Sequence, residues 1–368
     1  MISLLSRYVV RQLTTATLYA LVALLALYFF FDVMAQIGDV GQGSYNNAKM
    51  LWYVTLQIPA HAYELMPLAV LIGGLVALSQ LAAHSELTVI KTSGVRLRRI
   101  IGMVLQFAAV FAVATLLLGE WVVPAVGQRA EQFKLNATQD KISAGTRSGI
   151  WIKQNNDIIN VAEMLPDSSL RDITIYRHND NFELTETVYA AAATPQSAAV
   201  GNNANANNAI WHLQQVRRTE LQSNRAVAAH SDTLEWPAAV SRQLLNVLLV
   251  EPEQMSIAAL GTYVQHLQDN HQQTTRYELA WWRKISYPLA ALVMALVALA
   301  FTPQQTRHGN MGLKLFFGVC LGLAFHFAGR LFGFSSQLYG IPPFLAAILP
   351  TLLFACLAVW LIRKQERR

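Results

Sequence analysis

The chain has 368 residues, of which 54% are hydrophobic and only 14% charged, with a formal net charge of +6. An ordinary soluble domain carries roughly 25% charged residues, so the composition excludes a purely soluble protein. A mean hydropathy of only +0.31 also excludes a chain that lies wholly in a membrane, because a substantial polar part must dilute the apolar segments.

Six apolar segments are candidates for membrane spans, each of which needs about 20 mainly apolar residues. They are predicted at 13–31, 65–83, 100–119, 285–306, 315–329 and 344–362. The fifth is short unless it continues past Arg330 to Phe334. The sequence Gly340-Ile341-Pro342-Pro343 separates the last two, because two prolines cannot continue a helix. No small-residue cleavage site follows the first segment, so we interpret it as an uncleaved span rather than a signal peptide.

The basic residues predict the orientation of these spans, since Lys and Arg are enriched on the cytoplasmic side. One set of ends and loops holds Arg7, Arg11, Lys91, Arg96, Arg98, Arg99, Arg307, Lys314, Arg363, Lys364, Arg367 and Arg368. Of the opposite short loops, 36–50 carries only Lys49 and 335–343 carries no Lys or Arg. Both termini are therefore expected in the cytoplasm. The net positive charge then serves orientation and contact with membrane lipids, and no nucleic-acid partner is expected.

The segment from about 126 to 282 is expected on the other side of the membrane and is far too long for a loop. Polar turns separate three pairs of β-like runs, at 149–153 and 158–162, 170–176 and 182–189, and 210–221 and 226–235. These pairs predict an antiparallel sheet, as a small sandwich or jelly roll. Its expected inner face includes Ile175, Leu184, Val188 and Leu213.

The resulting fold class is an α-helical membrane protein with six transmembrane helices and an inserted all-β, jellyroll-like domain. The expected divisions are spans one to three in 1–125, the β domain in 126–250, a linker in 251–282 and spans four to six in 283–368. Residues 255–268 have a helical apolar stripe and are expected to return the chain to the fourth span.

Residues 65–94 are the most informative stretch, because a long apolar run ends in the short polar segment Ser85-Glu86-Leu87-Thr88-Val89-Ile90-Lys91. This pattern predicts a small amphipathic helix at one membrane face, with Glu86 in its first turn, where the helix dipole favours a carboxylate. Such a helix suits docking to a separate protein. The alternative is that Glu86 is only an N-terminal helix acid in a solvated loop.

Recognisable catalytic patterns are missing from the sequence. It contains neither G-x-x-x-x-G-K-[ST] nor H-E-x-x-H. His61 and Glu64 lack a second histidine for a metal site, and Cys320 and Cys356 lie in apolar runs where packing is the expected role. We therefore expect no catalytic residues and no metal or other cofactor bound by this chain.

Ionisable residues near membrane depth are costly and are functional candidates. Asp32, Glu64, His326 and Arg330 are in this class, with an interfacial position or snorkelling as the alternative. Arg276, Arg283 and Lys284 precede the fourth span on the side where basic residues are rare. A phosphate or anionic headgroup would suit them.

Several segments, in order along the chain, resemble the LptF/LptG permease family, and most resemble its LptG branch. They are Gly41-Gln42-Gly43-Ser44-Tyr45, the run from Ser85 to Gly94, Gly119-Glu120-Trp121-Val122-Val123-Pro124, Gly149-Ile150-Trp151, Arg276-Tyr277-Glu278-Leu279 with Trp282, and Tyr339-Gly340-Ile341-Pro342-Pro343. Each segment is weak alone, but the ordered set is specific.

The resemblance implies a subunit of an ABC-type exporter in the inner membrane of a Gram-negative bacterium, with its β domain in the periplasm. Such a subunit extracts lipopolysaccharide and passes it to a periplasmic bridge toward the outer membrane. The implied partners are an LptB-like ATPase dimer, which uses ATP and Mg, an LptF-like permease and an LptC-like protein.

The resemblance also implies roles for particular residues. The helix near Ser85 corresponds to the family's coupling helix, so Ser85, Glu86, Leu87 and Lys91 are the expected ATPase contacts. Spans one and five correspond to lateral gates, which assigns Phe30, Phe31, Asp32, Phe325 and His326 to the gate.

The chain departs from its relatives at the outer end of the first span. LptG relatives can carry lysines there, whereas this chain has Asp32, Gly38 and Asp39. The expected lipopolysaccharide contacts are instead Lys134, Arg276, Arg283, Lys284 and Arg330.

Two other classes of function are kept. An ion-driven lipid transporter would require acid or histidine pairs at mid-membrane and broken helices. A non-transporting scaffold for envelope assembly would use the β domain alone. Co-purification of a P-loop ATPase would separate the exporter from both.

Overall fold

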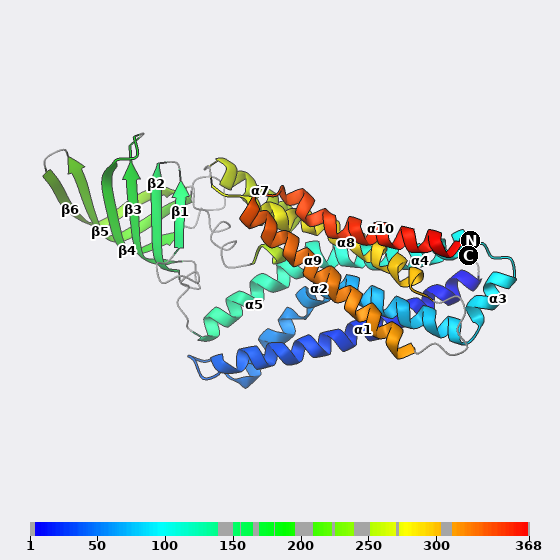
Figure 1. Cartoon of the computed structure of the whole chain (residues 1–368). Coiled ribbons are helices and arrows are strands. Elements are labelled where there is room, and N and C mark those ends of the chain that lie inside the picture. The colour runs from blue at the N-terminus through cyan, green and yellow to red at the C-terminus, as the bar shows by residue number, and fades with distance from the viewer. Residues whose placement is uncertain are drawn as a thin grey trace.

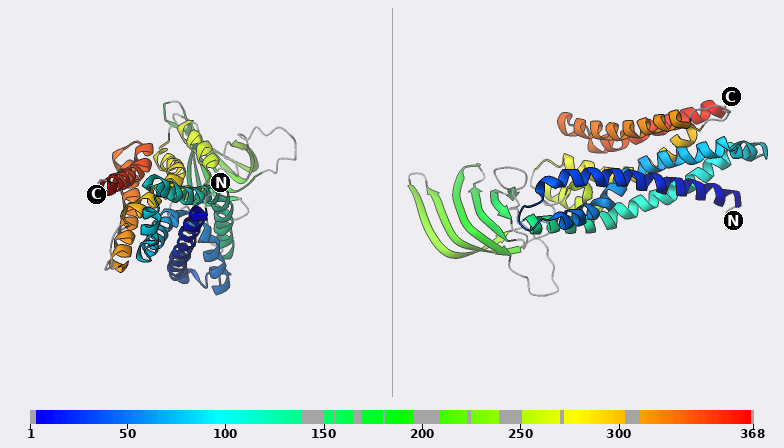
Figure 2. Two further views of the ribbon diagram at one scale, coloured as in Figure 1. Left: turned by 90° about the vertical axis from the view of Figure 1, so that its right-hand side faces the viewer. Right: turned by 90° about the horizontal axis from the view of Figure 1, so that it is seen from below.

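A computed structural model of the chain describes residues 4–138, 150–154, 156–164, 169–179, 181–195, 209–222, 225–238, 251–269, 272–302 and 311–366. A long bundle of helices carries a curved β-sheet at one end (Figures 1 and 2). The two chain ends and the short helix α3 lie at the opposite end of the bundle. Residues from both halves of the chain therefore form one helical unit, and the sheet is inserted between them.

The first half of the chain supplies three long apolar helical stretches. α1 (Leu4–Gln36) is followed by the 3₁₀ turn η1 (Ile37–Asp39), and α2 (Asn47–Ala83) begins where the Asn46 side chain accepts a hydrogen bond from the Lys49 backbone N–H. The short helix α3 (Glu86–Thr92) comes next. The third stretch is α4 (Leu97–Leu117), the π-helical turn η2 (Leu118–Val122) and α5 (Val123–Thr138).

The second half of the chain supplies the other helices. The 3₁₀ turn η3 (Pro252–Gln254) leads into α7 (Ile257–Asp269), which confirms the helix expected before the fourth span. The long helices are α8 (Thr275–Ala300), α9 (Met311–Tyr339) and α10 (Pro343–Glu366). α9 does continue beyond Arg330, so the fifth span is not short.

Six helices are long and apolar enough to cross a membrane, as expected: Leu4–Asp39, Asn47–Ala83, Leu97–Thr138, Thr275–Ala300, Phe316–Tyr339 and Pro343–Lys364. Their main core joins α1, α2, α4 and α8, and α2 lies at its centre with fully buried Leu71 and Leu78. Pro59 and Pro67 interrupt α2 without ending it. Prolines are tolerated in membrane helices because neighbouring groups satisfy the freed backbone atoms.

The third helical stretch runs past the expected division at residue 125. Its apolar character falls after Gly119, but α5 remains helical to Thr138 because its buried side packs on α2. Ala130 and Ala137 of α5 join Tyr45, Met50 and Val54 in a separate core cluster. Tertiary packing thus keeps helical a stretch whose sequence is no longer apolar.

The β domain contains six antiparallel strands in chain order, each paired with the next. They are β1 (Ile150–Gln154), β2 (Asp157–Met164), β3 (Leu170–His178), β4 (Leu184–Pro195), β5 (Ala209–Gln222) and β6 (Arg225–Ala238). All three expected strand pairs are present, with registers such as Ile152↔Ile159, Ile175↔Val188 and Leu213↔Leu234. The predicted class, a helical membrane protein with an inserted β domain, is confirmed.

One face of the sheet is apolar and buried, with Ile159, Ile173, Trp211 and Leu213 in its core. Ile175 and Val188 lie on this face as predicted, but Leu184 does not and is exposed. A register shift between Arg177 and His178 displaces the end of β4 on which Leu184 lies. The described strands form one curved sheet, and the second layer of a sandwich is not among them.

Candidate functional site

Side chains of several helices enclose a cavity of about 610 Å³. Side chains from α2, η3, α8, α9 and α10 line it. Its wall combines aromatic and small apolar residues with charged side chains of both signs. This mixture fits a ligand that is part apolar and part ionic, since most small-molecule sites pair an apolar lining with a few placed polar groups.

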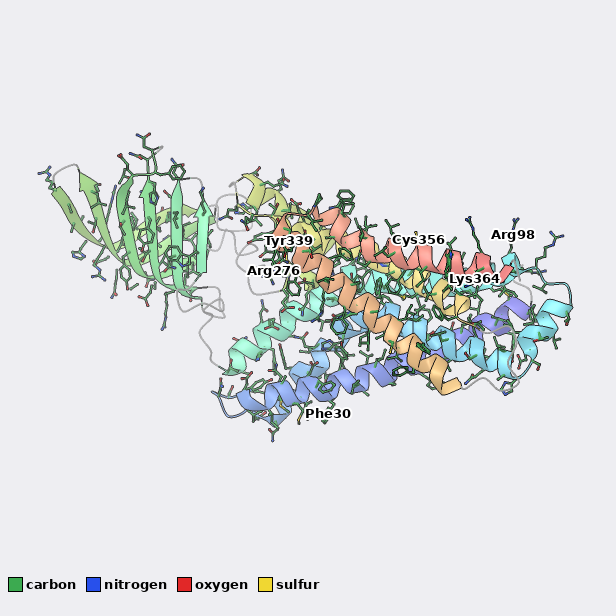
Figure 3. All side chains as sticks on the ribbon, viewed as in Figure 1. Phe30, Arg98, Arg276, Tyr339, Cys356 and Lys364 are labelled. Atoms are coloured by element: carbon green, nitrogen blue, oxygen red, sulfur yellow. The ribbon has the colours of Figure 1, made fainter. Side chains whose placement is uncertain are left out.

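Four of the five residues predicted to contact lipopolysaccharide line this cavity: Arg276, Arg283, Lys284 and Arg330. They come from α8 and α9, which are separated in the sequence. Figure 3 labels Arg276 at the end of the bundle near the sheet. The cluster of bases on the expected outer side is therefore one site in space.

These four cations differ in how free they are to bind a ligand. Arg283 Nη2 donates to the Gly329 carbonyl at 2.8 Å, and Arg283 Nη1 lies 3.7 Å from Glu253. Lys284 is only 5% exposed, and its ammonium donates to the Gly119 carbonyl at 2.6 Å. Arg330, by contrast, has 61% of its side chain exposed. Arg283 and Lys284 are held by backbone carbonyls of neighbouring helical segments, whereas Arg330 and Arg276 are more exposed to the cavity.

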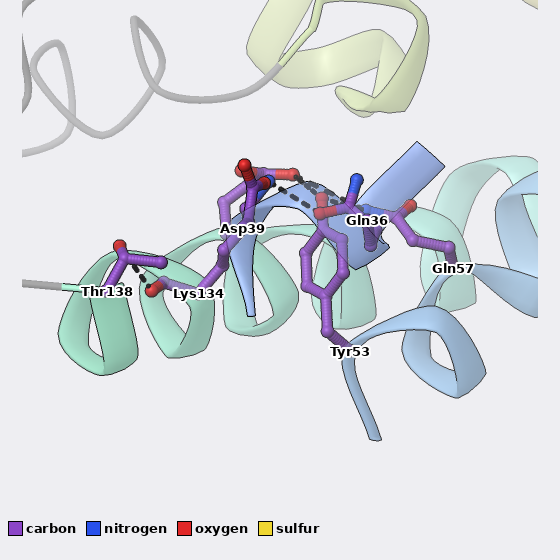
Figure 4. A network of polar contacts seen from close by, with 7 residues as sticks. Gln36, Asp39, Tyr53, Gln57, Lys134 and Thr138 are labelled. Atoms are coloured by element: carbon purple, nitrogen blue, oxygen red, sulfur yellow. Dashed lines mark hydrogen bonds and ion pairs between the residues drawn. The ribbon is translucent and has the colours of Figure 1, made fainter. Parts of the chain in front are cut away.

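Lys134, the fifth predicted contact, lies outside this cavity in a polar network between α1, α2 and α5 (Figure 4). Its ammonium is 2.8 Å from Asp39 and donates to Gln36 at 2.7 Å. It also lies over the Tyr53 ring, whose hydroxyl donates to Glu131. Asp39, at the outer end of the first expected span, therefore has a lysine partner within the same chain.

A second, smaller hollow of about 330 Å³ adjoins the cavity and shares Gln57, His61, Glu251 and Gln254 with it. Its lining includes Asp32 and Glu131. His61 Nε2 is 2.6 Å from Asp32 Oδ2, which ties α1 to α2. Among the described residues, no group of three or more His, Cys, Asp or Glu side chains is arranged to hold a metal ion.

The five predicted gate residues have different surroundings. Phe30 and Phe31 are exposed on α1, and Figure 3 labels Phe30 there. Asp32 is paired with His61. Phe325 is turned inward against Phe354 of α10, and His326 faces Glu64 in the cavity. Their assignment to a lateral gate stays a prediction.

The short helix α3 has the amphipathic form that the sequence predicts. Leu87 and Ile90 are buried in the main core, whereas Val89 is exposed. Glu86 occupies the first turn, and Ser85 adopts a positive φ of 60° immediately before it. The side chain of Lys91 lies outside the described residues. The buried face fixes α3 to the bundle and leaves the opposite face available for docking.

Sequence reasoning did not predict several polar contacts that join distant segments. Glu120 in η2 accepts a hydrogen bond from the backbone N–H of Ile257, the first residue of α7. Glu253 reaches Arg283, and Tyr53, Gln57 and Glu131 hydrogen-bond to one another. Only Glu120 stood within a recognisable motif, and the other partners share no local pattern that would have paired them.

Six candidate spans around a partly ionic cavity, with a docking helix at one end and an inserted sheet at the other, define a membrane permease. A family model described as "Lipopolysaccharide export system permease LptF/LptG" matches residues 7–364. The chain therefore belongs to the LptF/LptG family, as the ordered motifs predicted.

Curated relatives agree with the LptG branch of that family. The chain is 30% identical over 364 residues to "Lipopolysaccharide export system permease protein LptG" of Escherichia coli (strain K12), with 98% of each chain covered. It is 28% identical over 366 residues to the protein of the same name from Haemophilus influenzae (strain ATCC 51907 / DSM 11121 / KW20 / Rd), with 100% of each covered. Both similarities extend over the spans and the inserted sheet together.

Proposed function

We propose that this chain is a non-catalytic permease subunit of an ABC-type exporter that extracts lipopolysaccharide from the inner membrane and passes it to a periplasmic bridge. The observation that carries the proposal is the cavity, in which Arg276 and Arg330 face the same space from different helices beside apolar side chains. Lipopolysaccharide carries both phosphates and acyl chains, which matches that lining. The family match across residues 7–364 supports the same substrate.

The energy for extraction comes, in this proposal, from an LptB-like ATPase dimer that uses ATP and Mg, with no cofactor held by this chain. Each methylene brought into water costs about 0.8 kcal/mol, so lifting a lipid with several acyl chains needs both an energy source and an apolar shelter. The cavity and the apolar face of the sheet would provide the shelter. An LptF-like permease would complete the cavity, and an LptC-like protein would continue the path.

The proposed orientation places both termini in the cytoplasm of a Gram-negative bacterium and the sheet in the periplasm. Figure 3 labels Arg98 and Lys364 at the end of the bundle near α3, away from the sheet. A cytoplasmic excess of Lys and Arg would therefore put α3 where a soluble ATPase can reach it.

The function is tested by ATP-dependent release of lipopolysaccharide from proteoliposomes that contain the full purified complex. The variant R276Q/R330Q removes two cavity cations, and R129Q/R171Q is the matched control because neither arginine lines the cavity. We expect release to fall about tenfold or more in the first variant, consistent with the loss of two charge-assisted contacts, and to be unchanged in the control. Equal release from both variants would contradict a role for the cavity in extraction.

The ion-driven alternative has one observation in its favour, because two histidines face carboxylates within the bundle. His61 lies 2.6 Å from Asp32, and His326 lies 3.3 Å from Glu64. The same proteoliposomes separate the two mechanisms. Release that requires ATP and persists without a proton gradient supports the exporter, whereas release driven by the gradient alone supports the alternative.

A further inference from the structure

Glu64 of α2 places a carboxylate in the wall of the cavity that is proposed to receive phosphates. Its Oε1 atom lies 3.6 Å from Nη2 of Arg330 and 3.3 Å from Nε2 of His326. Both partners belong to α9, one helical turn apart. A single acid thus lies beside both an arginine and a histidine of the cavity wall that α9 contributes.

The contact can be reached from the cavity, because 33% of the Glu64 side chain and 61% of the Arg330 side chain are exposed. Arg283, the neighbouring cation, is held differently. It is only 23% exposed and donates to the backbone carbonyl of Gly329. An anion that enters the cavity therefore meets Arg330 as the more accessible cation, with Glu64 already beside it.

A carboxylate and a phosphate compete for the same face of a guanidinium group. Phosphate oxygens carry more charge and suit the bidentate geometry of arginine at least as well. Binding of a phosphate to Arg330 must then displace Glu64, whereas a lipid without phosphate forms no ion pair with Arg330 that could replace the contact with Glu64. An acid in this position therefore lowers the affinity for phosphorylated headgroups and affects the affinity for neutral ones less.

We propose that Glu64 is an internal counter-anion for Arg330, that a phosphate of the lipid substrate displaces Glu64 from Arg330, and that Glu64 thereby sets the affinity of the cavity for anionic headgroups. This role rests on the proposed function, because it assumes that the cavity receives the phosphates of the lipid. It differs from a direct substrate contact, since Glu64 acts through the availability of Arg330.

The test measures equilibrium binding to the full purified complex in nanodiscs of phosphatidylcholine. The two probes are fluorescent lipopolysaccharide and the same lipopolysaccharide after chemical removal of its lipid A phosphates. The variants are E64Q, R330Q and E64Q/R330Q. E278Q is the matched control, because Glu278 accepts hydrogen bonds from Thr274 and Gln268 and does not line the cavity.

We expect E64Q to bind phosphorylated lipopolysaccharide about two- to fivefold more tightly, the range expected for loss of a partly exposed competing ion pair. Its affinity for the dephosphorylated probe should change less. R330Q should bind the phosphorylated probe more weakly, and E64Q/R330Q should match R330Q, because Glu64 acts only through Arg330. E278Q should match the wild type.

An unchanged or weaker affinity of E64Q for the phosphorylated probe would overturn the proposed role of Glu64. If the wild type still binds the phosphorylated probe more tightly than the dephosphorylated one, the proposed function of the cavity would stand. Equal binding of both probes by the wild type would overturn phosphate recognition by the cavity as well. If E64Q does not assemble, Glu64→Asp is the second variant. Its carboxylate is withdrawn by one methylene, so its affinity should lie above that of the wild type, and an affinity at or below the wild type would again overturn the proposal.

Discussion

The hydroxyl of Tyr8 donates a hydrogen bond to Oε2 of Glu86 over 2.9 Å, and so joins the start of α1 to the first turn of α3. The two residues are 78 positions apart. α1 also contributes the predicted gate residues Phe30, Phe31 and Asp32. If a protein docks on α3 and forms an ion pair with Glu86, it acts on a residue that is hydrogen-bonded directly to α1.

Glu86→Lys should abolish recovery of a P-loop ATPase with the affinity-purified protein, because it reverses the charge expected to pair with an arginine of the partner. Thr92→Lys is the control, since it adds the same side chain at an exposed position of the same helix. Quantitative mass spectrometry of the co-purified proteins makes the comparison. Loss of the ATPase from both variants would show that added positive charge, rather than Glu86 itself, prevents docking.

Tyr8→Phe tests the link between docking and the first span. It removes the hydrogen bond to Glu86 but leaves the carboxylate, so ATPase recovery should stay near the wild-type amount. ATP-driven release of lipopolysaccharide per ATP hydrolysed should fall by about two- to fivefold, since one exposed hydrogen bond between the helices is lost. An unchanged ratio of release to hydrolysis would show that the bond does not transmit the nucleotide state.

Lys284→Met should reduce stability more than substrate affinity. The ammonium of Lys284 is buried against the Gly119 carbonyl and the Tyr63 ring, so its loss leaves a buried acceptor unpaired at a cost of about 1–3 kcal/mol. Arg276→Gln, at the more open position, should weaken binding of lipopolysaccharide with little change in melting temperature. Thermal unfolding and binding measured on both variants separate the two roles. If Lys284→Met loses affinity at an unchanged melting temperature, Lys284 is a direct contact as the sequence suggested.

Glu251 gives the protein a pH dependence. Burial, followed by the negative charge of Glu253, raises the pKa of Glu251, and Arg276 opposes the shift. The folded state therefore holds this proton more tightly than the unfolded state. Stability should fall as the pH rises from the unfolded pKa, roughly 4.3, through the raised folded pKa. Because Glu251 is partly exposed, the loss should stay below about 1 kcal/mol.

Glu251→Gln should remove this loss, so the variant should melt above the wild type at pH 7, and the difference should shrink toward pH 4. Glu183→Gln, in the turn between β3 and β4, is the control and should follow the wild type at every pH. Melting curves of the three proteins between pH 4 and pH 7 measure this difference. A constant difference between E251Q and the wild type would assign the effect to packing rather than to the proton.

The sequence predicted the elements well wherever one local property decided them. Uninterrupted apolar runs were sufficient for the six spans, and alternation between polar turns was sufficient for the strand pairs, including the pairing that puts Ile175 opposite Val188. The same reasoning failed for Leu184, because a register shift cannot be read from alternation. It also ended the third helix early, because contacts with α2 rather than apolar composition keep α5 helical.

The site was predictable in residue type but not in pairing. Charge near membrane depth identified Arg330, and basic residues on the expected outer side identified Arg276 and Arg283, but neither signal showed that the three share a cavity. The sequence did not distinguish the buried Lys284 from the exposed Arg330, and it did not predict that Lys134 pairs with an acidic residue. Those differences depend on Gly119, Glu64 and Asp39, which are distant in sequence and become neighbours only when the helices pack.

Gly73 should tolerate no side chain, because the backbone of α1 comes very close to α2 there. A Cβ at this position would collide with the Cα and N atoms of Thr17, whereas a Cβ at Gly102 of α4 would meet no atom within 4 Å. Small residues at helix interfaces allow such close approach in membrane proteins, and overpacking typically costs about 1–3 kcal/mol. Gly73→Ala should therefore lower the melting temperature of the purified protein. Gly102→Ala should hold or raise it, since alanine stabilises a helix interior by roughly 0.5–1 kcal/mol relative to glycine. Equal melting temperatures for the two variants would mean that α1 can move away from α2 at little cost, as a gate helix must. The Asp32–His61 and Tyr8–Glu86 contacts, rather than this packing, would then hold α1 in place.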